Sequence, residues 1–207
     1  MMENDKKISL THLDVLREIG TIGAGRAATA LAELLNCKVE ITLPETKLIP
    51  LESLDRILGN PEETYFVLDV GLEGDINGRV FFLLPPNNAK ILGSTLLGKP
   101  IEELDNNDLL FQSSLKEVVN ILTGGYMNVL SDMTGLTIMY GTPSLAIDMI
   151  AALLDFFFIH IAQYSDEAIF VKTQLKVKNM DFQGLFLFFP DLQSLRKLMD
   201  VLGVKDT

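Results

Sequence analysis

The chain has 207 residues, of which 48% are hydrophobic and 22% are charged, a composition typical of a globular protein and not of a disordered one. Its formal net charge of −11 argues against nucleic acid and anionic membrane surfaces as partners, because both would repel it. Cys37 is the only cysteine, so no internal disulfide can form, and a reducing cytoplasm is the simplest location.

The N-terminal half predicts six elements, in the order helix, strand, helix, strand, strand and helix. Thr11 is the expected N-cap of the first helix, Pro44 is expected to end the first strand, and "DING" (75–78) supplies a tight turn between the two paired strands. The expected elements span residues 10–35, 37–44, 51–59, 64–74, 78–85 and 91–99.

After a linking segment, 98–106, the C-terminal half predicts the same order again. Asn107 is the expected N-cap of its long helix, and "NMDFQG" (179–184) supplies the turn between its paired strands. Residues 155–165 have no counterpart in the first half, and their pattern leaves open whether they extend a helix or form an extra strand. The expected elements span residues 107–133, 136–143, 144–154, 168–177, 184–190 and 195–205.

The two halves also resemble each other residue by residue. An offset of 99 residues aligns Glu18 with Glu117, Gly25 with Gly124 and Pro44 with Pro143. The sequence therefore predicts an α+β fold in a single domain over residues 1–207, built from two α-β-α-β-β-α repeats (about 10–98 and 107–204) related by a pseudo-two-fold axis. We expect their hairpins to join in one continuous sheet, partly covered by the two long helices.

Each long helix carries a polar stripe in otherwise apolar or small residues. Ser113, Glu117 and Asn120 stand at i, i+4 and i+7, which places them on one narrow face of a helix. The aligned residues of the first repeat, with the same spacing, are Asp14, Glu18 and Thr21. A merely solvated helix face would look the same, but the repetition of the stripe favours a functional site.

Glycines gather in the middle of both long helices, where each costs roughly 1 kcal/mol relative to alanine. Close approach of another backbone, or tight packing between the two long helices, would explain them. The glycines are Gly20, Gly23, Gly25, Gly124 and Gly125.

The helices "LDVLREIGTIGAGRAATALAELL" (13–35) and "FQSSLKEVVNILTGGYMNVLSDMTG" (111–135) resemble the two signature helices of the CheC/CheX/FliY phosphatases. That signature is Asp or Ser, three residues, Glu, two residues and Asn. The resemblance covers nearly the whole chain and combines order, spacing and duplication. It implies a CheC-like fold and a protein phosphatase that removes the phosphoryl group from the aspartate of CheY, a chemotaxis response regulator.

The resemblance also implies roles for the second stripe. Asn120 would orient the attacking water, Glu117 would pair with the lysine of the regulator, and Ser113 would support the stripe by hydrogen bonding. In-line hydrolysis of an acyl phosphate needs a positioned water and neutralised charge, and a carboxamide can accept a hydrogen bond from the water while its NH₂ donates elsewhere. The regulator brings the Mg²⁺, so no cofactor of the protein's own is expected.

The first stripe departs from the family pattern, because Thr21 stands where the family has Asn. Asp14 and Glu18 remain, but threonine is shorter, offers a hydroxyl and is stiff at χ1. We expect this degraded site to dock weakly or not to catalyse. Arg26 stands where the family commonly has Asn, and it either alters docking or faces solvent.

The segment "TPSLAIDMIAALL" (142–154) resembles the helix with which CheC-like proteins dock the receptor deamidase CheD. The resemblance implies Ile147, Asp148, Met149 and Ile150 as contacts of CheD, although an ordinary amphipathic helix with one aspartate is the alternative. A mainly non-catalytic adaptor that binds and regulates CheD is therefore a second hypothesis. A structural part of the flagellar switch is a third, disfavoured because no counterpart of the C-terminal module of FliY is expected.

Other kinds of site have little support. His12 and His160 are far apart and lack metal-ligand spacing, so no metal site is expected, and no nucleotide-binding motif occurs. The charged first ten residues predict no signal peptide. Asp148, Asp155 and His160 interrupt the apolar runs before they reach the roughly 18–20 residues that a membrane-spanning helix needs.

Overall fold

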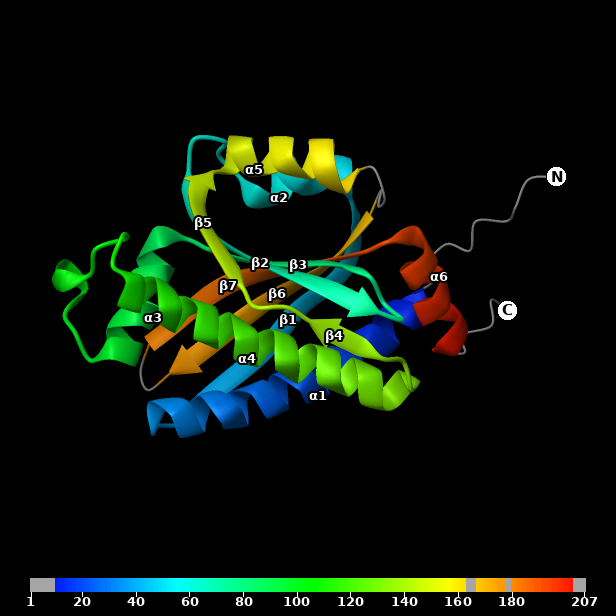
Figure 1. Ribbon diagram of the computed structural model, residues 1–207, viewed down its shortest axis with the longest axis horizontal. Coiled ribbons are helices and arrows are strands. Elements are labelled where there is room, and N and C mark those ends of the chain that lie inside the picture. Colours follow the sequence, from blue (N-terminus) through cyan, green and yellow to red (C-terminus); the bar gives the residue numbers. More distant parts are fainter. Residues whose placement is uncertain (1–9, 163–166, 178–179, 203–207) are drawn as a thin grey trace.

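A computed structural model describes residues 10–162, 167–177 and 180–202. Its seven strands form one continuous antiparallel sheet between two layers of helices (Figure 1). The order along the sheet is β1-β6-β7-β3-β2-β4, and β5 also pairs with β2. This architecture confirms the predicted α+β class. The strands are β1 Val39–Pro50, β2 Thr64–Gly74, β3 Gly78–Leu84, β4 Ile138–Tyr140, β5 Ser144–Met149, β6 Glu167–Val177 and β7 Met180–Pro190.

Two long helices, α1 (Leu10–Leu35) and α4 (Leu109–Thr134), cover one face of the sheet and run in opposite directions (Figure 1). The short helices α2 (Leu54–Leu58) and α5 (Ile150–Phe156) lie over the other face, and α3 (Pro86–Leu97) and α6 (Leu192–Val201) lie towards opposite ends of the molecule. Among the described helices, none combines the length and apolar character needed to cross a membrane.

The sheet separates two hydrophobic cores, and strand β3 contributes to both. Val80, Phe82 and Leu84 are buried in the core beneath α1 and α4, whereas Phe81 and Leu83 are buried in the core beneath α2 and α5. Successive side chains of a strand point to opposite faces of a sheet, so a continuous apolar run such as "VFFLL" is what a strand covered on both faces requires.

The two repeats exchange their first strands. Strand β1 of the first repeat pairs with β6 of the second, and β4 and β5 of the second repeat pair with β2 of the first. At the centre, β3 and β7 join the two hairpins. The result is the expected pseudo-two-fold arrangement, in which neither repeat contains all the strand partners of its own strands.

Glycines bring α1 and α4 into direct backbone contact. A Cβ atom added to Gly23 would lie 2.8 Å from the carbonyl oxygen of Gly125. One added to Gly125 would lie 2.8 Å from both the Gly23 carbonyl oxygen and the Ala27 Cβ. These approaches leave no room for a side chain, so tight packing between the long helices explains the two glycines.

The predicted end of the first strand at Pro44 is wrong, because β1 continues to Pro50. The register with β6 shifts between Thr42 and Glu45, and this irregularity places Pro44 where the ladder does not need an N–H donor. Strand β1 is also an edge strand, with β6 as its only partner in the described sheet. Proline is tolerated at such edges and bulges.

The predicted helix over 144–154 is wrong in its first half. Residues Ser144–Met149 form the strand β5, paired with Thr64–Asp69 of β2, and α5 begins only at Ile150. Leu145 and Ile147 pack on the core while Ala146 and Asp148 are exposed, which is the period-two alternation of a half-buried strand. The edge of β2 provided a partner that the helical interpretation did not consider.

The structure also shows where several helices and strands begin and end. Residues 155–161 extend the helix, as α5 is followed by a π-helical turn at Phe157–Ile161, while 163–165 lie outside the described residues. The N-cap of α4 is Asp108, whose side chain accepts from the Leu110 N–H at 2.8 Å, and not Asn107. Thr11 lies inside α1, and β7 begins four residues before the expected strand at 184.

Candidate functional site

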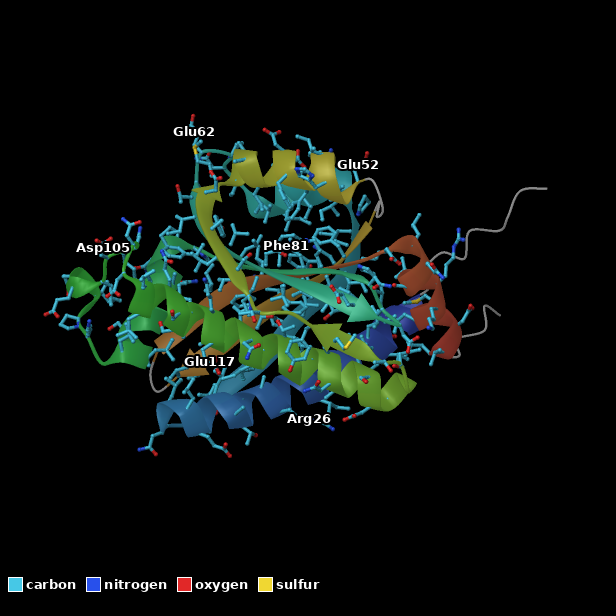
Figure 2. All side chains as sticks on the ribbon, in the orientation of Figure 1. Arg26, Glu52, Glu62, Phe81, Asp105 and Glu117 are labelled. Atoms are coloured by element: carbon cyan, nitrogen blue, oxygen red, sulfur yellow. The ribbon has the colours of Figure 1, made fainter. Side chains whose placement is uncertain are left out.

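The second stripe lies on the outer face of α4. Ser113 and Glu117 are exposed and Asn120 is half-buried, because the opposite face of the helix is committed to the core. Figure 2 shows Glu117 on the pair of long helices, on the opposite side of the sheet from Glu52 and Glu62. The fully buried residues of that opposite face include Leu115, Val118, Val119 and Leu122.

The polar side chains of the second stripe are not bonded to other described residues. Among the described residues, Ser113, Glu117 and Asn120 have no hydrogen-bonding or ionic partner for their side chains. A half-buried carboxamide without a partner retains its full capacity to donate and to accept. The arrangement can therefore present an amide and a carboxylate, one helical turn apart, to a visiting molecule.

The first stripe lies on the exposed face of α1 but differs in its bonding. Asp14, Glu18 and Thr21 are all exposed. The hydroxyl of Thr21 donates to the backbone carbonyl of Arg17 at 2.8 Å, a bond that serine and threonine commonly make to the preceding turn of a helix. Its proton is therefore used within the helix, and the side chain does not reach as far as an amide would.

Arg26 links the two long helices at the surface. Its Nη1 donates to Oδ2 of Asp132 at 2.7 Å, and both side chains are more than half exposed, at 53% and 60%. Exposed pairs of this kind contribute roughly 0–1 kcal/mol to stability. Of the two expectations for Arg26, the structure favours a solvent-facing residue, with Asp132 as its partner.

A hollow of about 300 Å³ opens beside Asn120, between α1 and α4. Two polar residues of its lining, Asn128 and Tyr140, were not predicted from the sequence. Asn128 was detectable, because it continues the stripe at i+8 from Asn120. Tyr140 lies in β4, and no local pattern connects it to the helix.

The four residues expected to contact CheD do not share a helix face. Ile147, Asp148 and Met149 end strand β5, and Ile150 starts α5 and is buried, with 1% exposure. The exposed Asp148 carboxylate accepts from the Met149 N–H at 2.8 Å. The helical surface implied by the resemblance is therefore wrong, since the pairing of β5 with β2 holds this segment extended.

No residues are gathered for metal binding in the part of the chain that the structure describes: no group of three or more His, Cys, Asp or Glu side chains is arranged to hold an ion. His160 is exposed and lies against Phe156, with 4.8 Å between the ring centroids and a tilt of 43° between the ring planes. The side chain of His12 lies outside the described residues.

Comparison with known proteins identifies the family to which the chain is related. The sequence profile of the CheC-like family matches residues 12–48 and 112–147, the two segments that contain the stripes. The chain is 33% identical over 196 residues to CheY-P phosphatase CheC of Bacillus subtilis, which covers 92% of this chain and 93% of that protein. It is 29% identical over 112 residues to the flagellar motor switch phosphatase FliY of Bacillus subtilis, covering 54% of this chain and 29% of that protein.

Among solved structures, Thermotoga maritima FliY has the same fold. The two match with a TM-score of 0.75 over 94% of this chain and 96% of that chain, at 18% sequence identity. Fold, duplicated segments and identity over nearly the full length agree. The chain therefore belongs to the CheC-like family.

Proposed function

We propose that this protein is a phosphatase that hydrolyses the aspartyl phosphate of a CheY-type chemotaxis response regulator in the cytoplasm. The observation that carries the proposal is the uncommitted side chain of Asn120, one turn from Glu117 on the exposed face of α4. The relationship to the CheY-P phosphatase CheC of Bacillus subtilis supports the reaction class, and the duplicated stripe supports the location.

In this mechanism Asn120 enters the phosphorylation site of the regulator. The amide oxygen accepts a hydrogen bond from a water molecule and holds it in line with the phosphorus. The water oxygen then forms the new bond while the bond between phosphorus and the aspartyl oxygen breaks, so the products are inorganic phosphate and the free carboxylate. The Mg²⁺ and lysine of the regulator neutralise the phosphoryl oxygens, and positioning is the contribution of the phosphatase.

Glu117 and Ser113 have supporting roles. The Glu117 carboxylate pairs with the lysine of the regulator and sets the angle at which α4 docks, because charge-assisted hydrogen bonds are directional and stronger than neutral ones. Ser113, one turn further towards the N-terminus, supports the stripe by hydrogen bonding. The stripe of Asp14, Glu18 and Thr21 contributes little, because the Thr21 hydroxyl is already bonded to Arg17.

The test is the release of phosphate from phosphorylated regulator by the wild type and by Asn120→Ala. Loss of a preorganised hydrogen-bonding group costs roughly 10²–10³ in kcat in other enzymes, so we expect a fall of at least 100-fold. Thr21→Ala is the matched control, at the aligned position of α1, and should change the rate by less than about twofold. If phosphate release with the wild type is no faster than the regulator's own decay, the proposal is wrong.

We propose CheD as a second partner, bound at the end of β5. Asp148 and Met149 are exposed there, and the half-buried Ala151 and Ala152 follow in α5, so a partner could approach without a steric barrier. Capture of purified CheD by the wild type and not by Asp148→Lys would support this contact. Equal capture by the two proteins would remove it, whatever the phosphatase assay shows.

A further inference from the structure

Two consecutive glycines of α4 line the hollow beside Asn120. These glycines are Gly124 and Gly125. A Cβ atom on Gly124 would lie 2.7 Å from the hydroxyl oxygen of Tyr140 and 3.9 Å from the amide nitrogen of Asn128. The phenol and the second amide therefore both lie near Gly124.

The hollow continues the functional stripe. Asn120, Gly124 and Asn128 follow one another at steps of four residues, so they stay near one face of α4. Asn120 and Tyr140 are half-buried and Asn128 is exposed. Within the described residues, none of these three side chains has a hydrogen-bonding partner. Three groups that can both donate and accept thus line one depression.

The aligned positions of α1 show the contrast. Thr21 and Thr29 stand where α4 has Asn120 and Asn128. Thr21 donates to the Arg17 carbonyl at 2.8 Å, and Thr29 donates to the Gly25 carbonyl at 3.1 Å. Both hydroxyls are thus satisfied by their own helix. The side chains at these two positions therefore differ between the repeats. On α1 both bond to their own helix, whereas on α4 both stay open.

We propose that this hollow is a second contact for the response regulator, in which Asn128 and Tyr140 bind the main chain of a loop beside the phosphorylated aspartate. The inference rests on the proposed function, because a regulator that receives Asn120 must also cover the adjoining hollow. Amides and phenols both donate and accept, which matches the N–H and C=O groups of a peptide. The cation at the rim, Arg26, is already paired with Asp132, so a neutral occupant fits better than an ion.

Asn128 and Tyr140 are accordingly binding residues, and they do not touch the reacting atoms. Their loss should weaken docking and leave the chemical step intact, which separates them from Asn120. A neutral hydrogen bond between proteins corresponds to about fivefold in affinity. We expect Asn128→Ala and Tyr140→Phe each to raise the Kd and the KM for the regulator about fivefold, with kcat within twofold of the wild type.

The experiment measures two quantities for each variant. Calorimetry gives the Kd for a CheY-type regulator held in the active state with beryllofluoride, and phosphate release gives kcat and KM. Thr29→Ala, at the aligned position of α1, is the control and should change none of the three. Circular dichroism confirms that each variant is folded, which is expected because Asn128 is exposed and Tyr140→Phe keeps the ring over Gly124.

The outcomes separate the two proposals. If the wild type is active and both variants bind the regulator as tightly as it does, the hollow has no role and the proposed function stands. If the wild type binds but does not accelerate hydrolysis, the proposed function fails, and a weaker Kd for Asn128→Ala still supports the contact. If the wild type does not bind the regulator, both proposals are overturned.

Discussion

Asn120 and Thr21 occupy aligned positions on two similar helices and differ in what their side chains bond to. The Thr21 hydroxyl lies close enough to its own backbone to donate to Arg17. The Asn120 side chain has no such bond among the described residues, so it stays open to a partner. A difference of one side chain thus gives two related helices unequal capacity for the same chemistry.

Tyr126 shows the opposite situation, a polar group enclosed by the core. It is 5% exposed, and its ring packs edge-on against Phe186, with 4.9 Å between the centroids. Burial raises the pKa of the Tyr126 phenol to about 12, because the phenolate would have to be desolvated. Unfolding returns the phenol to water, where its pKa is about 10.

This difference predicts a loss of stability at high pH. The folded state holds the proton of the Tyr126 phenol more tightly than the unfolded state does. The phenol therefore contributes its full share of stability below pH 10, and this share is lost as the pH rises towards 12. Two pKa units correspond to about 3 kcal/mol. We expect denaturant titrations to show that the free energy of unfolding of the wild type falls between pH 9 and pH 12 by up to that amount, relative to Tyr126→Phe. Parallel stability curves for the two proteins would contradict this account.

At the scale of elements, the pairing of α1 with α4 depends on glycine at particular places. Gly23 lies against backbone atoms of Gly125 and Tyr126, at 2.8 and 2.9 Å from the position of an added Cβ. Gly25, only two residues away, has nothing within 4 Å of that position. The same residue type thus permits helix contact at one position and merely lowers helix propensity at the other.

Alanine substitutions at these two positions should therefore change stability in opposite directions. Gly23→Ala forces the helices apart and should destabilise the protein by about 1–3 kcal/mol. Gly25→Ala meets no obstacle and should stabilise it by about 0.5–1 kcal/mol through helix propensity. Urea denaturation midpoints of the two variants measure this. A destabilised Gly25→Ala would show that its surroundings are more crowded than the structure indicates.

At the scale of the whole molecule, the sheet interleaves the repeats. The ladder between β1 and β6 is one of the long ones of the sheet, from Val39 with Val177 to Pro50 with Glu167, and it joins the first repeat to the second. The single-domain organisation, which stays a prediction, follows naturally from this exchange. A repeat on its own would leave the edges of its hairpin and its first strand unpaired, which favours aggregation.

Separated halves test this view. We expect the fragments 1–104 and 105–207 to lack cooperative unfolding when each is alone, because each then loses strand partners and part of both cores. Mixed together, they should recover the far-ultraviolet circular dichroism and the thermal transition of the intact chain. A first fragment that unfolds cooperatively alone, as a monomer, would refute the interdependence of the repeats.

The sequence by itself determined the features that repeat within a few residues. The spans of α1 and α4, the duplicated order of elements and the stripe of Ser113, Glu117 and Asn120 follow from helical and strand periods, which are local properties of the chain. The family was also predicted from those helices, and the comparison confirms it. The catalytic roles of Glu117 and Asn120 stay predictions.

Only the tertiary structure decided the features that depend on distant partners. Residues 144–149 became a strand because β2 offers them an edge, and Pro44 stayed inside β1 because the ladder with β6 shifts register there. Tyr140 lines the same hollow as Asn128 only because β4 ends near Gly124 of α4. Each outcome is a contact between segments far apart in the chain, and local periodicity carries no information about such contacts.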